Sequence, residues 1–277
     1  MKKVIQIVCV AVVIGLGSVA VAVDIETVHV GNPGNAADDT GYGAVAYEYN
    51  IGKYEVTNAQ YTEFLNAVAK TDTYGLYRTS MGFDYGGIVR SGGVGDYTYA
   101  VIAGRGDMPV IHVSFWDATR FANWLHNGQG AGDTETGAYT LTADSIINNI
   151  VTRNAGARWA VTSENEWYKA AHYSPATSTY YDYPTSSDTA PTAEAPAGGL
   201  NSANYDQIVA DMTDVGAYTS SDSPYGTFDQ GGNVWEWNEA ILGGGSHHAG
   251  RVVGFQRTRS ARVVPQPRLL YPNFRDH

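Results

Sequence analysis

The chain has 277 residues, with 17 Lys and Arg against 28 Asp and Glu, so its formal net charge is −11. This length suits one large or two small domains, and a 43% hydrophobic content excludes a broadly disordered chain. The acidic balance argues against nucleic-acid binding, which needs a basic surface. The single cysteine excludes a disulfide framework and any Cys-rich metal cluster.

The first 22 residues have the organisation of a secretory signal peptide. Lys2 and Lys3 provide a basic start, an apolar run extends from Val4 to Leu16, and Ala20-Val21-Ala22 fits a cleavage site. The apolar run is short for a membrane-spanning helix. We therefore predict that residues 1–22 are cleaved on export, the alternative being an uncleaved anchor. The predicted location is secreted, periplasmic or in the cell envelope, without stable membrane insertion after cleavage.

The residues that follow have an extended, turn-rich pattern. Val28–Val30 and Ile51–Val56 are strand candidates, and alternating apolar residues at 45, 47 and 49 indicate another strand. Three stretches show no helical period and are rich in small and polar residues. We expect loops and short strands at 71–107, a loop region at 127–157, and an irregular surface excursion at 173–203.

Three capped helices are expected. Each begins with a hydroxyl side chain that can cap the first turn, followed three residues later by a polar residue that suits that turn. The pairs are Thr57 with Gln60, Ser114 with Asp117, and Ser163 with Glu166. Apolar residues at helical spacing follow each cap. Short helices among many short strands and long loops predict an α+β domain with high irregular content, and not a doubly wound sheet.

The sharpest local pattern runs from Phe228 to Trp237 and reads F-D-Q-G-G-N-V-W-E-W. Asp229 and Glu236 supply carboxylates, and the glycines between them permit a sharp turn that can aim backbone carbonyls inward. Oxygen ligands on one tight loop suit a hard cation such as Ca²⁺, and the two tryptophans would wall the loop from the core side. The alternative is a glycine turn before an aromatic core strand, with both acids solvated.

A second loop, residues 201–206, is rich in amides and acids and is followed by Asp211 and Asp214. Taken alone, this pattern favours a solvated loop over another cation site. No phosphate-binding, dinucleotide-binding or serine-nucleophile motif is present, and the histidines lack metal-ligand spacing. The sequence therefore assigns no catalytic residue.

Four motifs resemble those of the formylglycine-generating enzyme family, the sulfatase-modifying-factor domain, and they follow the family's order over roughly residues 45–240. They are K-Y-E-V-T-N at 53–58 with Tyr61 and Phe64, P-V and V-S-F-W-D-A and W-L within 109–125, S-E-N-E-W and A-A within 163–171, and G-N-V-W-E-W at 232–237. The last motif is the most specific of the family's signatures.

This resemblance implies a single domain, residues 24–242, with a fold like that of the formylglycine-generating enzyme and related to C-type lectins. It also implies structural Ca²⁺. One ion would be held by the side chains of Asp229 and Glu236 and the carbonyls of Gly232 and Val234. A second would use Asn204, the Tyr205 carbonyl and a later Asp whose position the resemblance does not fix.

Two departures from the family stand out. Ala160-Val161-Thr162 replace the family's R-L-P, which puts the local structure there in doubt. Residues 243–277 lack the R-G-G-S and G-F-R segments, and they lack the Ser and two Cys that bind copper in the family's oxidase. Half of the twelve arginines lie in 251–277, with one acid, Asp276. This atypical basic tail is either a frameshifted or truncated end of the domain, or a basic extension that binds an acidic surface.

Together these features predict a secreted member of the family without oxidase activity, a pseudoenzyme that binds no copper. Cys9 lies in the signal, so the processed chain would have no thiol. Loops rich in Tyr, Trp, Ser, Asn and Gly suit adaptable recognition, so we expect a calcium-stabilised domain that binds a protein or a saccharide. The alternatives are an enzyme with thiol-independent chemistry on an exported protein, and a non-functional truncated family member.

Overall fold

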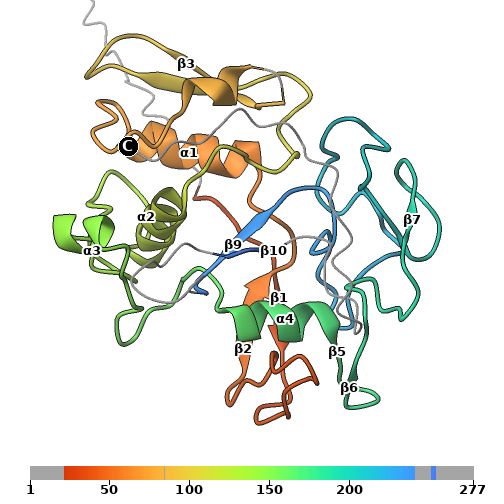
Figure 1. The fold of residues 1–277 in the computed structure, drawn as a ribbon. Coiled ribbons are helices and arrows are strands. Elements are labelled where there is room, and N and C mark those ends of the chain that lie inside the picture. Colours follow the sequence, from red (N-terminus) through yellow and green to blue (C-terminus); the bar gives the residue numbers. More distant parts are fainter. Residues whose placement is uncertain (1–21, 84, 241–250, 254–277) are drawn as a thin grey trace, which may run out of the picture.

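Figure 1 shows the protein as a computed structural model, which describes residues 22–83, 85–240 and, for the backbone alone, 251–253. The predicted signal peptide, apart from Ala22, and most of the predicted basic tail lie outside the described residues. The predicted domain, 24–242, is described except at positions 84, 241 and 242. Among the described residues, no helix is long and apolar enough to cross a membrane.

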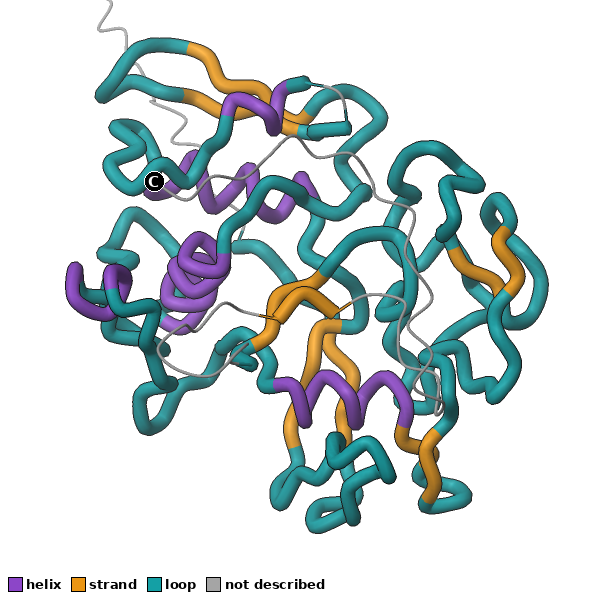
Figure 2. Tube along the Cα trace, viewed as in Figure 1, coloured by secondary structure: helices purple, strands orange, loops and turns teal. Residues whose placement is uncertain are grey.

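Short helices joined by long loops make up most of this part of the chain (Figure 2). The helices are α1 (Asn58–Val68), α2 (Phe115–His126), α3 (Ala143–Ile147), α4 (Glu164–His172) and the 3-10 helix η1 (Thr79–Gly82). α1, α2 and α4 begin directly after the three predicted N-caps, and each forms a reciprocal capping box. These three predictions are confirmed.

α3 corrects the prediction that residues 127–157 form a loop region. Its cap is also reciprocal: the N–H of Ser145 donates to the Thr142 hydroxyl at 3.0 Å, and the N–H of Thr142 donates to the Ser145 hydroxyl at 2.8 Å. None of its five residues is buried. The sequence therefore offers no apolar face from which the helix could have been recognised.

The strands of the described chain are short and form two-stranded sheets. The pairs are β1 (Thr27–Val30) with β2 (Tyr49–Gly52), β3 (Ile88–Ser91) with β4 (Thr98–Val101), β5 (Tyr173–Ser174) with β6 (Thr179–Tyr180), β7 (Thr192–Ala193) with β8 (Ser202–Ala203), and β9 (Glu236–Asn238) with β10 (Arg251–Val253). Only β7 and β8 are parallel among these. Strands β5–β8 add regular structure to the predicted surface excursion.

The region before α1 differs in detail from its prediction. Val45 and Tyr47 lie in irregular chain, where the N–H of Gly34 donates to the Val45 carbonyl at 2.8 Å and the N–H of Val45 donates to Asn35 Oδ1 at 3.3 Å. These loop contacts replace the ladder that the alternating pattern predicted. β2 starts two residues before the expected strand at 51–56 and ends at Gly52.

β10 brings part of the predicted tail into the fold. Its backbone pairs antiparallel with β9, so that Val252 lies opposite Trp237 and Val253 opposite Glu236. Both strands lie near the centre of the molecule in Figure 1. A segment that follows residue 242 is thus paired with the G-N-V-W-E-W motif.

The main core lies between α1 and α2 and consists largely of aromatic residues. The ring of Phe64 lies 5.4 Å from the rings of both Phe121 and Trp124. Tyr61 and Leu65 extend this cluster, and all five side chains are buried. A second cluster surrounds α4 and includes Trp167, Tyr168, Ala171, Tyr173 and Tyr180. The predicted apolar helix faces therefore form the core.

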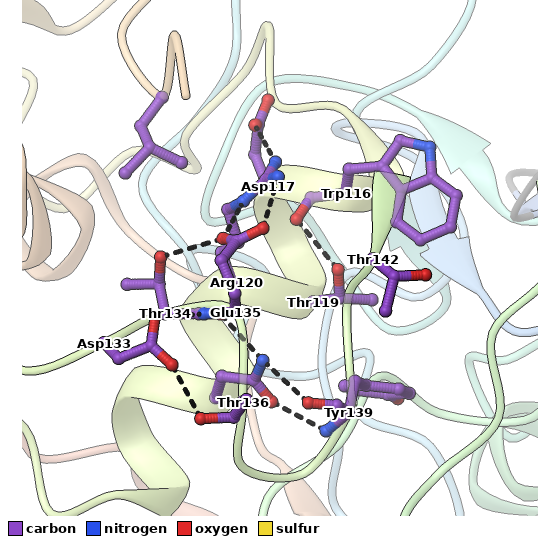
Figure 3. Close-up of polar contacts among 12 residues, drawn as sticks. Trp116, Asp117, Thr119, Arg120, Asp133, Thr134, Glu135, Thr136, Tyr139 and Thr142 are labelled. Carbon is purple, nitrogen blue, oxygen red and sulfur yellow. Dashed lines mark hydrogen bonds and ion pairs between the residues drawn. The ribbon is translucent and has the colours of Figure 1, made fainter. Parts of the chain in front are cut away.

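Polar contacts fasten the loop after α2 to the helix itself (Figure 3). Arg120 donates from Nε and Nη2 to the two carboxylate oxygens of Glu135, at 2.6 and 3.0 Å. Asn123 donates from Nδ2 to the Thr134 carbonyl at 2.7 Å, and its Oδ1 accepts the N–H of Tyr139 at 2.7 Å. Arg120 and Asn123 are both buried, so these bonds form away from water and fix the loop's course.

Candidate cation site

The G-N-V-W-E-W motif begins in a loop that lies directly against the second predicted loop. The N–H of Asn233 donates to the Asn204 carbonyl at 2.9 Å. Gly232 has a φ of 125°, and a Cβ at this position would lie 2.8 Å from the same carbonyl oxygen. Glycine is required here because a side chain would be both strained and too close. The fold thus joins two loops that are separate in the sequence.

The side chain of Asn233 holds the segments around this loop together. Its Oδ1 accepts the N–H of Thr213 at 2.9 Å, and its Nδ2 donates to Glu55 Oε1 at 3.2 Å. Its backbone φ of 53° lies in the left-handed region, where Asn is tolerated better than most residues. The motif's asparagine therefore has a structural role in positioning Glu55.

Three carboxylates, those of Glu55, Asp229 and Glu236, lie close enough to influence one another. Asp229 Oδ2 accepts the N–H of Gly216 at 2.6 Å, and Glu236 Oε2 accepts the indole N–H of Trp167. Glu55 Oε2 is enclosed by protein and has no hydrogen-bond partner among the described residues. An enclosed carboxylate oxygen without a donor is costly, so this atom needs an explanation.

Burial is the largest cause that raises the pKa of each acid. It raises the pKa of Asp229 to about 6, and it raises that of Glu236 to about 7 with the added repulsion of Asp229. Burial, then the charges of Asp229 and Glu236, raise the pKa of Glu55 well above its usual range. None of the three forms an ion pair within the described ranges. Their negative charge is therefore uncompensated by a basic side chain.

Carboxylates without a basic partner are the kind of ligand that a hard divalent cation takes. Ca²⁺ takes oxygen ligands from carboxylates and backbone carbonyls. The described residues contain no group of three or more His, Cys, Asp or Glu side chains that could hold a metal ion. Carbonyl oxygens would therefore have to complete the coordination, and Gly232 and Val234 are the residues that the resemblance names for this role.

Glu55 is absent from the ligands expected from the sequence. It lies in the K-Y-E-V-T-N motif, three residues after β2 ends, and 178 positions from its partner Asn233. The motif itself is the only local signal, because the charge interactions of Glu55 arise from the tertiary fold. Its proximity to Asp229 and Glu236 could not be deduced from spacing.

The two tryptophans of the motif occupy different environments, which corrects the expectation that both wall the loop from the core side. Trp237 is partly buried, donates from Nε1 to the Val113 carbonyl at 2.8 Å, and lies 6.2 Å from the Phe115 ring. Trp235 is 49% exposed. Side chains alternate along an extended segment, so residues 235 and 237 would be expected to share a side, but Trp235 precedes β9 and follows the loop instead.

In the second loop, the backbone carbonyls of the expected ligands each accept a hydrogen bond. The Asn204 carbonyl accepts the N–H of Asn233, the Asn204 side chain donates to the Asp211 carbonyl at 2.8 Å, and the Tyr205 carbonyl accepts the N–H of Ile208 at 3.1 Å. The Asp211 carboxylate is bound by Arg105, as described below. Asp206 and Asp214, the other acids considered, are exposed. The second Ca²⁺ site therefore stays a prediction, and the guanidinium beside Asp211 is the feature that opposes it.

A second set of polar residues, centred on Arg153, supports the base of α4. Arg153 donates from Nη1 and Nη2 to the two oxygens of Glu166, at 2.8 and 2.6 Å, and from Nε to Glu239 at 2.9 Å. Burial acts to raise the pKa of Glu166, but the hydrogen bonds and charge of Arg153 outweigh it and lower the pKa to about 2. Tyr47 and Tyr139 donate to Glu166 and Glu239.

This network also orders the segment that lacks the family's R-L-P residues. Arg153 Nη2 donates to the Val161 carbonyl at 2.6 Å, and the N–H of Val161 donates to the Tyr139 hydroxyl at 2.9 Å. The N–H of Glu239 donates to the Thr162 carbonyl at 2.8 Å. Residues 160–162 therefore have a defined course, although neither the Arg nor the Pro is present.

Comparisons with known proteins agree with the motifs. Residues 18–264 match the family model described as "Sulfatase-modifying factor enzyme 1-like domain". A curated relative, hercynine oxygenase of Mycobacterium tuberculosis, is 25% identical over 201 residues, which cover 70% of this chain and 38% of the relative. The chain thus spans well under half of that relative's length.

Two solved structures are also similar. One, Treponema denticola variable protein 1, has a TM-score of 0.47 at 19% identity, over 84% of this chain and 78% of that chain. The other, CarF, has a TM-score of 0.45 at 21% identity, over 84% of this chain and 91% of that chain.

Proposed function

Because the chain belongs to the family of the sulfatase-modifying factor enzyme 1-like domain, we propose that it is an exported, non-catalytic member that binds a protein or saccharide ligand and is stabilised by Ca²⁺. The fold is the family's α+β domain with high irregular content. The proposal concerns what the domain does beyond that membership.

The enclosed Oε2 of Glu55 carries the calcium part of the proposal. This oxygen has no donor among the described residues, and two further acids, Asp229 and Glu236, add negative charge beside it. A divalent cation would satisfy the unpaired oxygen and offset the repulsion at the same time. It would also favour the ionised carboxylates, which burial alone disfavours.

The cysteine content supports the non-catalytic part. The chain has one cysteine, Cys9, which lies in the predicted signal peptide. Thiolate is the form of cysteine that binds metals and acts as a nucleophile. After cleavage of the signal, the chain would have no thiol for copper chemistry of the kind that the resemblance implies for the family's oxidase.

Exposed aromatic side chains support the recognition part. Tyr47 is 52% exposed, Phe83 65%, Tyr85 47% and Trp235 49%. Aromatic rings of this kind contribute large contact areas in protein interfaces, and their faces suit the apolar sides of sugar rings. Trp235 stands beside the candidate cation site, so cation binding would also fix the loop that presents this ring.

A second candidate function is thiol-independent catalysis on an exported protein. The curated relative is an oxygenase by name, although this chain spans only 38% of its length. We expect no turnover when the purified protein is incubated with a Cys-containing sulfatase peptide, oxygen and added copper or iron. Turnover of the peptide would favour the enzyme over the binding domain.

The calcium proposal is tested by melting the purified protein with EDTA and with increasing Ca²⁺. Added Ca²⁺ should raise the melting temperature of the wild type progressively, because it binds only the folded state. Asp229→Asn should abolish most of this rise. Asp222→Asn changes an exposed acid and should behave as wild type. A wild-type melting temperature that does not respond to Ca²⁺ would rule the proposal out.

A further inference from the structure

We infer that this domain holds one cation and not two, because the guanidinium of Arg105 takes the place of the second ion by neutralising Asp211. The inference rests on the proposed function for the first ion only. Two adjoining loops differ in charge. The acids around the G-N-V-W-E-W loop have no basic partner in the described residues, whereas Asp211 of the second loop is paired with Arg105.

The ion pair between Arg105 and Asp211 has the geometry of a strong, bidentate contact. Arg105 Nη1 donates to Asp211 Oδ2 at 3.0 Å, and Nη2 donates to Oδ1 at 2.9 Å. The N–H of Met212 adds a third donor to Oδ1 at 2.7 Å. Parallel N–H bonds of this kind fix both carboxylate oxygens, so the acid has a full set of donors without a metal.

Arg105 is itself held firmly in this position. Its Nη2 also donates to the Tyr85 carbonyl at 2.6 Å, and its own carbonyl accepts from Asn58 Nδ2 at 2.9 Å. The Arg105 side chain is 15% exposed and that of Asp211 is 34% exposed. The pair therefore lies partly out of water, where the interaction is stronger than between free surface groups.

Two backbone carbonyls of the second loop accept hydrogen bonds as well. The carbonyls of Asn204 and Tyr205 accept N–H groups from Asn233 and Ile208, at 2.9 and 3.1 Å. Glu55 Oε2 is the opposite case, since it is enclosed without a donor. Each of these carbonyls keeps a second lone pair, so the obstacle to a second ion is the Arg105–Asp211 ion pair, which would have to break, whereas the first site would gain a partner.

The charges around the two loops also favour one bound ion. Around the first site, Glu55, Asp229 and Glu236 form no ion pair with a base in the described residues, so a divalent cation reduces repulsion. In the second loop, the Arg105 charge already balances that of Asp211. A Ca²⁺ ion placed there would be repelled by the guanidinium at short range.

The test is the number of Ca²⁺ ions bound per chain, measured by equilibrium dialysis with radioactive Ca²⁺ on the full protein. One bound ion, lost in Asp229→Asn, is expected. Two bound ions would overturn this inference and leave the proposed function intact. No bound ion would overturn the proposed function and the inference together.

Asp211→Asn tests the second loop while it leaves the ligands of the first site in place. If Asp211 is paired with Arg105 and is no ligand, this variant should still bind one ion, with less than about a tenfold change in affinity. Asp222→Asn serves as the exposed control. Loss of the bound ion in a folded Asp211→Asn protein, judged by unchanged circular dichroism, would show that Asp211 is a ligand and would overturn the inference.

Discussion

Glu55 shows how a single side chain can define a site that spacing along the sequence does not predict. It lies in a motif far from Asp229 and Glu236, yet its carboxylate is enclosed near both. Asp229 and Glu236 could be named in advance because they flank a glycine turn within one short segment. Glu55 could not, because only folding brings β2 and the 228–237 loop together.

Glu55→Gln tests whether this carboxylate serves a cation. The amide has the same shape without the charge, so in EDTA at pH 8 the variant should match or exceed wild-type stability, by up to about 1 kcal/mol. Its Ca²⁺ affinity should fall about tenfold. Urea denaturation and calorimetric titration measure the two effects, with Glu63→Gln as an exposed control. Unchanged Ca²⁺ affinity would contradict the role given to Glu55.

Gly232→Ala tests the close approach of the two loops. The new Cβ would lie 2.8 Å from the Asn204 carbonyl oxygen, at a φ of 125°. We expect a loss of about 1–3 kcal/mol in the free energy of unfolding. Gly93→Ala is the matched control, since its Cβ would meet nothing within 4 Å and its φ is not positive. Equal stabilities for both variants would show that the loops can separate freely.

Arg153 connects α4 to the strand region that follows the cation loop. It binds Glu166 of α4 and Glu239, just after β9, and both acids accept further hydrogen bonds from tyrosines. The position of Glu166 could be predicted as the third residue of a capping box. Arg153 could not be predicted as its partner, because Arg153 lies in a loop without periodicity and the contact forms only in the tertiary fold.

Arg153→Met should lower the free energy of unfolding at pH 7 by about 3 kcal/mol, since it leaves Glu166 buried and unpaired. The pKa of Glu166 is lowered from 4.5 to about 2 in the folded protein. Its stabilising contribution is therefore present above about pH 4.5 and lost as the pH falls towards 2. The difference in the free energy of unfolding between wild type and variant, measured by urea denaturation, should become smaller over this pH range.

Arg158→Met is the control for that experiment. Arg158 is exposed and donates to the His126 carbonyl without forming an ion pair in the described chain. Its replacement should change stability by no more than about 0.5 kcal/mol. A gap that stays constant between pH 7 and 2 for Arg153→Met would mean that the pair does not account for the loss.

Across whole elements, the helices with both a cap and an apolar face could be predicted, and α3, with a cap alone, could not. β1 was predicted at Val28–Val30, but the shortest strands escaped prediction for a different reason. β5 to β8 are two residues each, too short to carry an alternating pattern, and their pairing depends on loops folding back. The same applies to β10, which the basic composition of residues 251–277 concealed.

The molecule as a whole combines a loop-rich surface with a small number of buried charged groups. Its 16% charged residues place few ions on the surface. Several partly buried charges are paired: Arg105 with Asp211, Arg120 with Glu135, and Arg153 with Glu166. The acids around the G-N-V-W-E-W loop form no such pair in the described residues, and this imbalance leads to the proposal of a single stabilising cation.

Crystals of the protein grown with Ca²⁺, with anomalous diffraction data collected at long wavelength, would locate any bound ion. We expect one anomalous peak beside Asp229 and Glu236, and density for the Arg105–Asp211 pair without an ion. The absence of a peak beside Asp229 and Glu236 at saturating Ca²⁺ would contradict the cation site. A peak at Asp211 would contradict the replacement of the second ion by Arg105.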